Sequence, residues 1–328
     1  MVSVNWGILG VAKINDRLIP AFHKSCNAAV SVIASRDAAK AAAAAKAAGI
    51  PHSCGRYEDV LADPSIQAVY LPLPNALHVE WAKKAADAGK HILCEKPLAP
   101  TAAEAADLIA YCQAKGVKLL DGFMWPHHPR TARIRELIQA GEIGDVLSAA
   151  GAFTFLLNLT TENIRLHADM GGGSLLDVGC YPVYGIRWAF GAEPVRVFAT
   201  AKMLHGVDVA MKGLLWFADG RSASFDCGFT EPLRQWFEIV GTGGVITIRN
   251  MWLPTSNAEL DIQRGEIAVE TIACPGFDQI VCMIESFSRA ILENRDPWPA
   301  ADEAVRTLRV LDALARSARE ERVVEIGN

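Results

Sequence analysis

The stretch Gly7–Asn15, with the sequence GILGVAKIN, decides the fold because it ends an apolar run and opens a turn. A dinucleotide-binding turn needs a glycine where the chain bends, a small residue where the backbone approaches a pyrophosphate, and a helix that begins facing the phosphates. Gly10 and Ala12 meet the first two needs, and Asn15 stands where a third small residue is usual. A glycine-rich strand end is also a common structural turn, so the position between strand and helix carries the prediction. We expect the cofactor to be lined here by Gly10, Ala12, Lys13 and Ile14.

Short apolar runs alternate with helical stretches up to Gly122, which is typical of a parallel sheet with crossover helices. The expected strands are 4–9, 30–34, 68–72, 91–94 and 117–120, and the expected helices are 38–48, 75–88 and 102–115. The sequence therefore predicts an α/β domain over residues 1–122, a doubly wound Rossmann domain that binds NADP(H).

Longer strands follow one another through tight turns after Gly122, a pattern that favours an antiparallel or mixed sheet. The expected strands are 146–155, 195–203, 209–217, 222–229, 235–240 and 245–248, and the expected helices are 129–140, 174–190, 277–292 and 302–318. Residues 241–244 (GTGG) resemble a phosphate loop, but they join two strands, so a hairpin turn explains them better. Residues 123–328 are thus predicted to form an α+β domain on a large open, mostly antiparallel sheet.

Composition excludes several classes of protein. The chain has 328 residues, 51% of them hydrophobic, and a formal net charge of −5 with interspersed charges, which disfavours a nucleic-acid partner. No apolar run reaches the ~20 residues of a membrane span, and the N-terminus lacks the pattern of a signal peptide. The eight cysteines are scattered without a Cys-x-x-Cys pair, so we expect a reduced, cytoplasmic protein. No metal site is expected, because no pair among His127, His128, His167 and Asp169 has a helical i, i+4 spacing with an evident third ligand.

The end of the second expected strand indicates which dinucleotide binds. An NAD site usually places an acidic residue there to accept a hydrogen bond from the ribose 2′-hydroxyl. Here Ser35 and Arg36 can donate to a 2′-phosphate, and Lys40 adds positive charge one helical turn later. Asp37 is a candidate for the NAD acid, but its place before an alanine-rich helix suits an N-cap better. NADP(H) is therefore favoured over NAD(H).

Three further motifs point to one family. They are LPLPNALH at residues 71–78, GKHILCEKPL at residues 89–98 and GGGSLLDVGCY at residues 171–181. Together with the first turn, they resemble the Gfo/Idh/MocA oxidoreductase family from end to end. Tyr181, which stands where many members carry histidine, is similar to the subgroup of dimeric dihydrodiol dehydrogenase, glucose–fructose oxidoreductase and NADP-dependent xylose dehydrogenase.

The resemblance implies a catalytic role for Lys96, which lies beside the nicotinamide and orients the reacting oxygen. A partly desolvated lysine at the carboxyl end of a parallel strand can do this; the alternative is a surface lysine before a proline turn. Tyr181 would be the proton donor and acceptor, or else a half-buried aromatic residue with a satisfied hydroxyl. Asp177 would shape the site. Glu95 either tunes or positions the Lys96 side chain, or it faces solvent. Further cofactor contacts are expected from Leu73, Asn75, His78, Glu95 and Lys96.

Substrate contacts are expected from Trp125, whose ring offers a flat face for a sugar. Arg165 either binds substrate hydroxyls or forms a structural salt bridge, and the sequence favours neither alternative. The resemblance implies hydride transfer between NADP(H) and a hydroxyl or ketone of a carbohydrate-like small molecule, a sugar, polyol or diol. A cofactor-dependent glycosidase of the same superfamily and a non-catalytic sugar or cofactor sensor are the alternatives. Relatives pair through the second domain, so a homodimer or homotetramer is expected.

Overall fold

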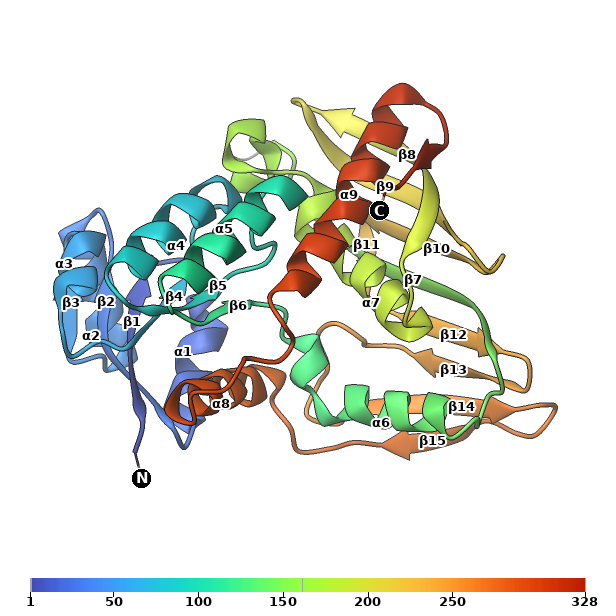
Figure 1. Ribbon diagram of the computed structural model, residues 1–328, viewed down its shortest axis with the longest axis horizontal. Coiled ribbons are helices and arrows are strands. Elements are labelled where there is room, and N and C mark those ends of the chain that lie inside the picture. Colours follow the sequence, from blue (N-terminus) through green and yellow to red (C-terminus); the bar gives the residue numbers. More distant parts are fainter. Residues whose placement is uncertain (1, 161, 328) are drawn as a thin grey trace. The chain divides into compact units, whose positions relative to one another are not determined.

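A computed structural model describes residues 2–160 and 162–327 of the chain. The described residues form two compact units (Figure 1). The first contains the chain up to His127 together with Asp278–Val305, and the second contains His128–Phe277 and the residues from Arg306 onward. In the described part of the chain, no helix combines the length and apolar character that crossing a membrane requires.

Strands and helices alternate along the first unit (Figure 1). Its elements are β1 (Val4–Leu9), α1 (Asn15–Lys24), β2 (Ala28–Ala34), α2 (Ala38–Ala48), β3 (His52–Cys54), α3 (Tyr57–Ala62), β4 (Ala68–Leu71), η1 (Asn75–Leu77), α4 (His78–Asp87), β5 (His91–Cys94), α5 (Ala102–Ala114), β6 (Leu119–Asp121), η2 (Trp125–His127) and α8 (Gln279–Leu292). All pairings are parallel, in the order β3-β2-β1-β4-β5-β6. The predicted parallel Rossmann sheet is confirmed, with β3 and α3 as short additions.

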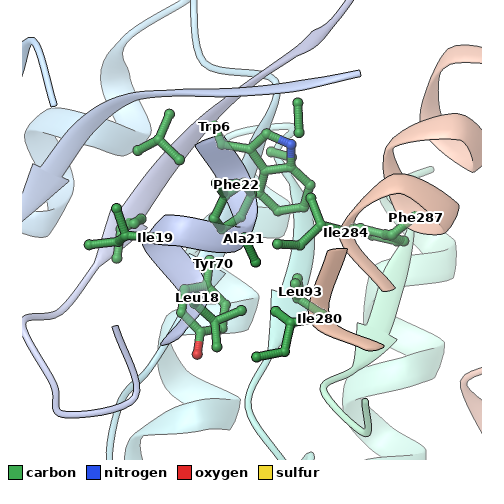
Figure 2. Packing of buried hydrophobic residues seen from close by; sticks show 14 of the residues in the cluster. Trp6, Leu18, Ile19, Ala21, Phe22, Tyr70, Leu93, Ile280, Ile284 and Phe287 are labelled. Carbon is green, nitrogen blue, oxygen red and sulfur yellow. The ribbon is translucent and has the colours of Figure 1, made fainter. Parts of the chain in front are cut away.

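One face of this sheet is closed by α1 and by α8, which comes from far along the chain. Trp6 on β1 lies between Phe22 of α1 and Phe287 of α8, with ring centroids 5.2 and 5.9 Å apart (Figure 2). The Trp6 indole N–H also donates to Ser288 Oγ at 3.3 Å. Helices α4 and α5 pack against each other over the opposite face (Figure 1). The segment around α8, expected in the second domain, therefore completes the core of the first unit.

The second unit is built on a wide sheet. Its elements are α6 (Pro129–Gln139), β7 (Val146–Leu156), η3 (Ile164–Leu166), η4 (Ala168–Met170), η5 (Leu175–Gly179), α7 (Cys180–Phe190), β8 (Pro194–Leu204), β9 (Val207–Phe217), β10 (Ser222–Gly228), β11 (Thr230–Arg234), β12 (Phe237–Gly241), β13 (Gly244–Ile248), β14 (Glu259–Arg264), β15 (Glu270–Ala273), α9 (Asp302–Glu320), which starts in the first unit, and β16 (Val324–Glu325). The strand order is β15-β14-β13-β12-β7-β10-β9-β8-β16, with β11 paired to β7.

Only β7 and β10 pair in parallel among the described strands of this sheet, so the predicted mostly antiparallel sheet is confirmed. Strands β12 and β13 form an antiparallel hairpin, which confirms residues 241–244 as its turn. Strands β11, β14, β15 and β16 were not predicted. Each is short, with at most six residues, and carries little periodicity of its own.

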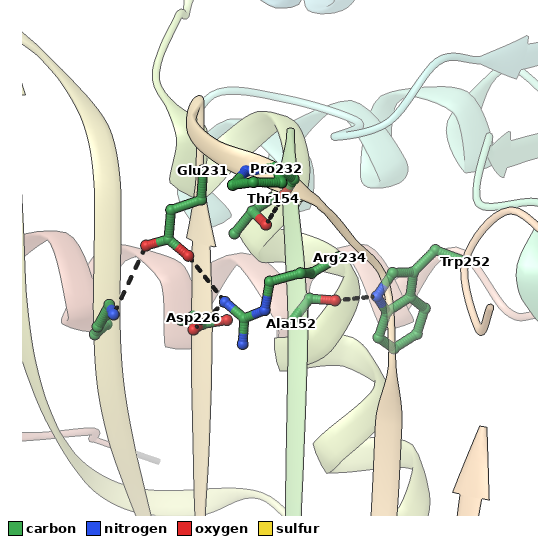
Figure 3. A network of polar contacts seen from close by, with 8 residues as sticks. Ala152, Thr154, Asp226, Glu231, Pro232, Arg234 and Trp252 are labelled. Atoms are coloured by element: carbon green, nitrogen blue, oxygen red, sulfur yellow. Dashed lines mark hydrogen bonds and ion pairs between the residues drawn. The ribbon is translucent and has the colours of Figure 1, made fainter. Parts of the chain in front are cut away.

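The face of the sheet turned away from its helices carries charged side chains (Figure 3). Arg234 donates to Asp226 at 2.7 Å and to Glu231 at 2.9 Å. In the same region the indole N–H of Trp252 donates to the carbonyl of Ala152 at 2.8 Å. Arg234 thus joins β11 to β10, and the bond from Trp252 ties the loop after β13 to β7.

Candidate active site

The turn after β1 is shaped for close backbone approach. Gly10 has a φ of 141°, and a Cβ there would lie 3.2 Å from a Leu73 methyl carbon and 3.3 Å from the Pro72 carbonyl oxygen. Both the conformation and the space therefore require glycine. The Asn15 side-chain amide donates to the Gly10 carbonyl at 2.8 Å, so asparagine ties the turn to α1 where a third small residue is usual. Ile14 provides no side-chain cap to α1, which leaves this helix end suited to an anion.

The other residues expected around this turn differ in exposure. Ala12 and Asn75 are half-buried, and Lys13 is exposed. Leu73 is buried, with its methyl group against the turn. All of them lie in the loops that directly follow the neighbouring strands β1 and β4. Ligands bind at this carboxyl edge in open parallel sheets.

The end of β2 separates the capping acid from the candidate phosphate-binding residues. The Asp37 carboxylate accepts hydrogen bonds from the backbone N–H groups of Ala39 at 2.9 Å and Lys40 at 3.1 Å. Its predicted role as N-cap of α2 is confirmed. The side chains of Arg36 and Lys40 are exposed, whereas Ser35 is buried and accepts from the Asp37 N–H at 3.2 Å. Arg36 and Lys40 are thus exposed cations on either side of the capping carboxylate, and Arg36 also interacts with the Tyr57 hydroxyl.

Lys96 follows β5 in a cluster of buried acidic and phenolic groups. Glu95 is 9% exposed, and its carboxylate accepts a hydrogen bond from the Tyr70 hydroxyl at 2.7 Å, so it does not face solvent. Burial raises the pKa of Asp121 well above its usual value; the charge of Glu95 raises it further and that of Lys96 lowers it. Lys96 itself is half-buried. It therefore lies within electrostatic reach of Asp121, which also interacts with Glu95, at the carboxyl edge of the sheet.

His78 connects two loops at this edge of the sheet through its buried imidazole ring. It is fully buried, and its Nδ1 and Nε2 lie 2.9 and 2.8 Å from the carbonyl oxygens of Pro97 and Leu73. Burial lowers the pKa of His78. The ring joins the loop after β4 to the turn that follows Lys96, and direct contact of His78 with a cofactor stays a prediction.

The segment after β6 is more enclosed than a substrate platform would be. Trp125 is 0% exposed, and His127 is 9% exposed with its ring edge-on to Trp298 at 5.3 Å. Burial lowers the pKa of His127 to about 3. Stacking of a sugar on Trp125 therefore stays a prediction.

In the second unit, Arg165 and Asp177 form an ion pair. Arg165 Nε donates to Asp177 Oδ2 at 2.6 Å, and its Nη2 approaches Oδ1 at 3.5 Å. The negative charge of Asp177 raises the pKa of Arg165. The structure thus contains the salt bridge that was one of two alternatives for Arg165. The Arg165 side chain is still 39% exposed, so a role toward a substrate stays open to test.

Tyr181 lies near this pair in an aromatic setting. It is 5% exposed, with Phe153 edge-on at 5.1 Å and the Trp252 ring at 5.9 Å. Its hydroxyl is close enough to Arg165 for the two groups to interact electrostatically. Phe153 and Trp252 were not predicted as neighbours of Tyr181, because Phe153 lies on β7 and Trp252 in the loop after β13.

The glycine block 171–173 holds the Arg165 segment in place. The Gly173 N–H donates to the Arg165 carbonyl at 2.9 Å, and a Cβ at Gly172 would lie 2.6 Å from the same oxygen. The continuous helix expected over 174–190 is wrong at its start, because Leu175–Gly179 forms a π turn. There the Cys180 N–H donates to the Leu175 carbonyl, five residues back. Such π turns often occur at functional sites.

Chemically, the first unit offers a turn for a pyrophosphate, exposed cations at the end of β2, and a lysine at the carboxyl end of β5. The second unit offers a phenol beside an ion pair. Within the described residues, no group of three or more His, Cys, Asp or Glu side chains is arranged to hold a metal ion.

Comparison with known proteins identifies the family to which these sequence motifs and this fold correspond. Residues 4–123 match "Oxidoreductase family, NAD-binding Rossmann fold", and residues 131–247 match "GFO/IDH/MocA C-terminal domain". D-xylose 1-dehydrogenase (NADP(+)) 2 of Haloferax volcanii is 40% identical over 98% of this chain and 99% of its own. Trans-1,2-dihydrobenzene-1,2-diol dehydrogenase of Xenopus tropicalis is 32% identical over 78% of each chain. The crystal structure of KijD10, a 3-ketoreductase from Actinomadura kijaniata in complex with NADP and TDP-benzene, superimposes with a TM-score of 0.91 at 30% identity, covering 96% of this chain and 98% of that one.

Proposed function

The chain belongs to the Gfo/Idh/MocA family of oxidoreductases, and we propose that it transfers a hydride between NADP(H) and a carbohydrate-like substrate. It is a dehydrogenase or reductase acting on CH–OH groups, as its relatives are named. The substrate is a sugar, polyol or diol. The observation that carries the proposal is Lys96, which stands at the carboxyl end of β5 in the same parallel sheet as the Gly10 turn.

The residues present suit NADP(H). Gly10 leaves room for a pyrophosphate, and α1 begins beside it without a side-chain cap. Asp37 is occupied in capping α2 and is poorly placed to accept from a ribose 2′-hydroxyl. Arg36, which also interacts with the Tyr57 hydroxyl, and Lys40 are exposed and can approach a 2′-phosphate from solvent. This arrangement supports NADP(H) over NAD(H). When bound, the nicotinamide supplies the hydride donor or acceptor.

Side chains of the protein transfer the proton and bind the substrate. We assign to Lys96 the donation of a hydrogen bond to the reacting oxygen, which polarises a ketone or stabilises the alkoxide formed from an alcohol. Tyr181 gives or takes the hydroxyl proton. Asp177 holds Arg165, whose remaining N–H groups bind substrate hydroxyls. Glu95 and Lys96 both interact electrostatically with the buried carboxyl of Asp121, so the three groups form one polar cluster behind the reacting oxygen.

The assembly is proposed to be a homodimer or homotetramer formed through the open face of the sheet in the second unit. Leu214 on β9 is 43% exposed there, two residues after Lys212, whose ammonium lies 3.7 Å from Glu231 of the charged cluster around Arg234. Exposed apolar side chains rimmed by charges are typical of protein interfaces. We place the enzyme in the cytoplasm, with its cysteines as free thiols, and expect only small-molecule substrates as partners.

The proposal is tested by titrating the purified protein with NADPH and with NADH while cofactor fluorescence is followed. A panel of aldoses, polyols, osones and diols is then assayed with whichever cofactor binds. Tight NADPH binding with turnover of a panel member supports the proposal. Binding without net redox turnover would shift the assignment to a glycosidase or a sensor, and absence of binding would contradict it.

A further inference from the structure

The π turn Leu175–Gly179 is capped by a side chain from another strand. Asp208 on β9 accepts a hydrogen bond from Ser174 Oγ at 2.5 Å and another from the Leu175 N–H at 2.7 Å. Ser174, the residue that precedes the turn, makes no side-chain cap to it. The first N–H groups of a helix need an acceptor, and a carboxylate also interacts favourably with the helix dipole. Asp208 therefore acts as an N-cap of the π turn, although it lies on another strand and not in the chain that enters the turn.

The backbone is adapted to this carboxylate. Gly173 has a φ of 111°, and a side chain there would collide with Asp208 Oδ1. Ser174 is fully buried. Burial raises the pKa of Asp208, and the hydrogen bonds from Ser174 and Leu175 oppose that rise. Glycine is thus required at position 173, because any side chain there would occupy the place of the Asp208 carboxylate.

The far end of the turn is fixed by close packing. A Cβ at Gly179 would lie 2.8 Å from Cys227 Sγ on β10. Cys227 Sγ also lies 3.7 Å from Ser174 Oγ. The turn is therefore held at its start by β9 and at its end by β10, two strands that are paired with each other. Asp177 lies between these two anchors.

From these contacts we infer that Asp208 is a positioning residue: it fixes the π turn and through it the orientation of Asp177, Arg165 and Tyr181. The inference rests on the proposed function only for its catalytic consequence. An extra residue in a helical turn rotates everything that follows, so loss of the turn would reorient Tyr181 relative to Arg165. Misplacement of a reacting group by about 1 Å can cost about a hundredfold in rate.

The test compares Asp208→Asn with the control Asp261→Asn. Both hydrogen bonds to the π turn end on Asp208 Oδ2. Asparagine at 208 keeps the shape but loses the charge, so an amide oxygen at that place accepts more weakly than a carboxylate and an amide nitrogen accepts nothing. Asp261 is also a carboxylate on a strand of this sheet, 8% exposed and bound to Thr271 Oγ1 at 2.6 Å, but it has no contact with the π turn among the described residues. Amide hydrogen exchange of the peptide 174–181 is measured in both variants, together with kcat, KM and the Kd for NADPH.

We expect Asp208→Asn to speed exchange in 174–181 at least about tenfold and to lower kcat by about ten- to a hundredfold, with the Kd for NADPH unchanged. Asp261→Asn is expected to change none of these. A Ser174→Ala, Asp208→Asn double variant should lose less activity than the two single variants together, because both changes act on the Ser174–Asp208 contact.

Wild-type exchange in Asp208→Asn would overturn the inference, and so would faster exchange with wild-type kcat. The exchange measurement needs no substrate. If no panel compound is turned over, the proposed function fails while the role of Asp208 in the turn is still decided by exchange.

Discussion

Arg165 and Asp177 are paired through Nε and Oδ2 at 2.6 Å, and the pair lies near the hydroxyl of Tyr181. The two charges cancel, so the surroundings of this phenol offer hydrogen-bonding groups without a net charge. A neutral, polyhydroxylated substrate suits such a surface better than a substrate with a charged group at the same place.

Replacing Arg165 by alanine is therefore expected to weaken substrate binding selectively. A hydrogen bond to a charged group is worth about 1.5–3 kcal/mol, which corresponds to a rise in KM of about tenfold or more. The Kd for NADPH should stay at its wild-type value. Arg133→Ala, which removes an exposed arginine of α6 paired with Glu136, is the matched control. An unchanged KM in Arg165→Ala would leave the ion pair with a structural role only.

Lys96→Ala is expected to lower turnover by about two powers of ten or more, because the reacting oxygen loses its hydrogen-bond donor. NADPH affinity, measured by fluorescence, should be largely retained. Lys115→Ala removes an exposed lysine of the same unit, paired with Asp87, and should leave turnover unaffected. Retained turnover in Lys96→Ala would remove Lys96 from the mechanism.

At the end of β2, two adjacent substitutions separate cofactor choice from helix capping. Arg36→Ala should weaken NADPH more than NADH, because the 2′-phosphate loses a charged partner. Asp37→Ala should lower the free energy of unfolding by about 1 kcal/mol through loss of the cap, with the NADPH-to-NADH preference unchanged. Equal weakening of both cofactors by Arg36→Ala would contradict the assignment of this arginine.

His127 predicts a pH dependence of stability. Burial lowers its pKa from 6.5 to about 3, so the unfolded chain binds a proton that the folded chain excludes. The contribution of the neutral imidazole is therefore complete above pH 6.5 and is lost as the pH falls toward 3. At pH 5 the free energy of unfolding should be about 2 kcal/mol lower than at pH 7 from this group alone.

The variant His127→Phe keeps an aromatic ring beside Trp298 and removes the titration. Urea unfolding at pH 7 and pH 5 should show a pH effect smaller by about 2 kcal/mol than in the wild type. Other buried histidines, such as His78, titrate in both proteins and cancel from the comparison. Identical pH effects in the two proteins would mean that His127 is not the group responsible.

Features that depend on neighbours in sequence were predictable. The turn at Gly10 needs a glycine between a strand and a helix, and Asp37 stands directly before alanines that form α2. The distinction between the capping Asp37 and the exposed Arg36 followed from that local pattern. The hairpin at 241–244 was predictable for the same reason, since two apolar runs flank it closely.

Features that depend on distant contacts were not. The apolar stripe of α8 indicates an amphipathic helix, but nothing in it specifies that Phe287 packs against Trp6, far away in sequence. The π turn looks like ordinary helix in sequence, because its geometry depends on Asp208 of β9. Trp252 reaches Tyr181 from the loop after β13. Each of these is a tertiary contact with no local signature.

The central claim is hydride transfer between NADP(H) and the carbon of a hydroxyl group, and isotope tracing tests it most directly. The purified protein is incubated with NADP+ and D-xylose deuterated at carbon 1, followed by correspondingly labelled members of the sugar panel, and the mass of the reduced cofactor is measured. We expect NADPH that is one mass unit heavier with at least one labelled substrate. Substrate consumption without labelled NADPH, or no transfer of label from any member of the panel, would contradict it.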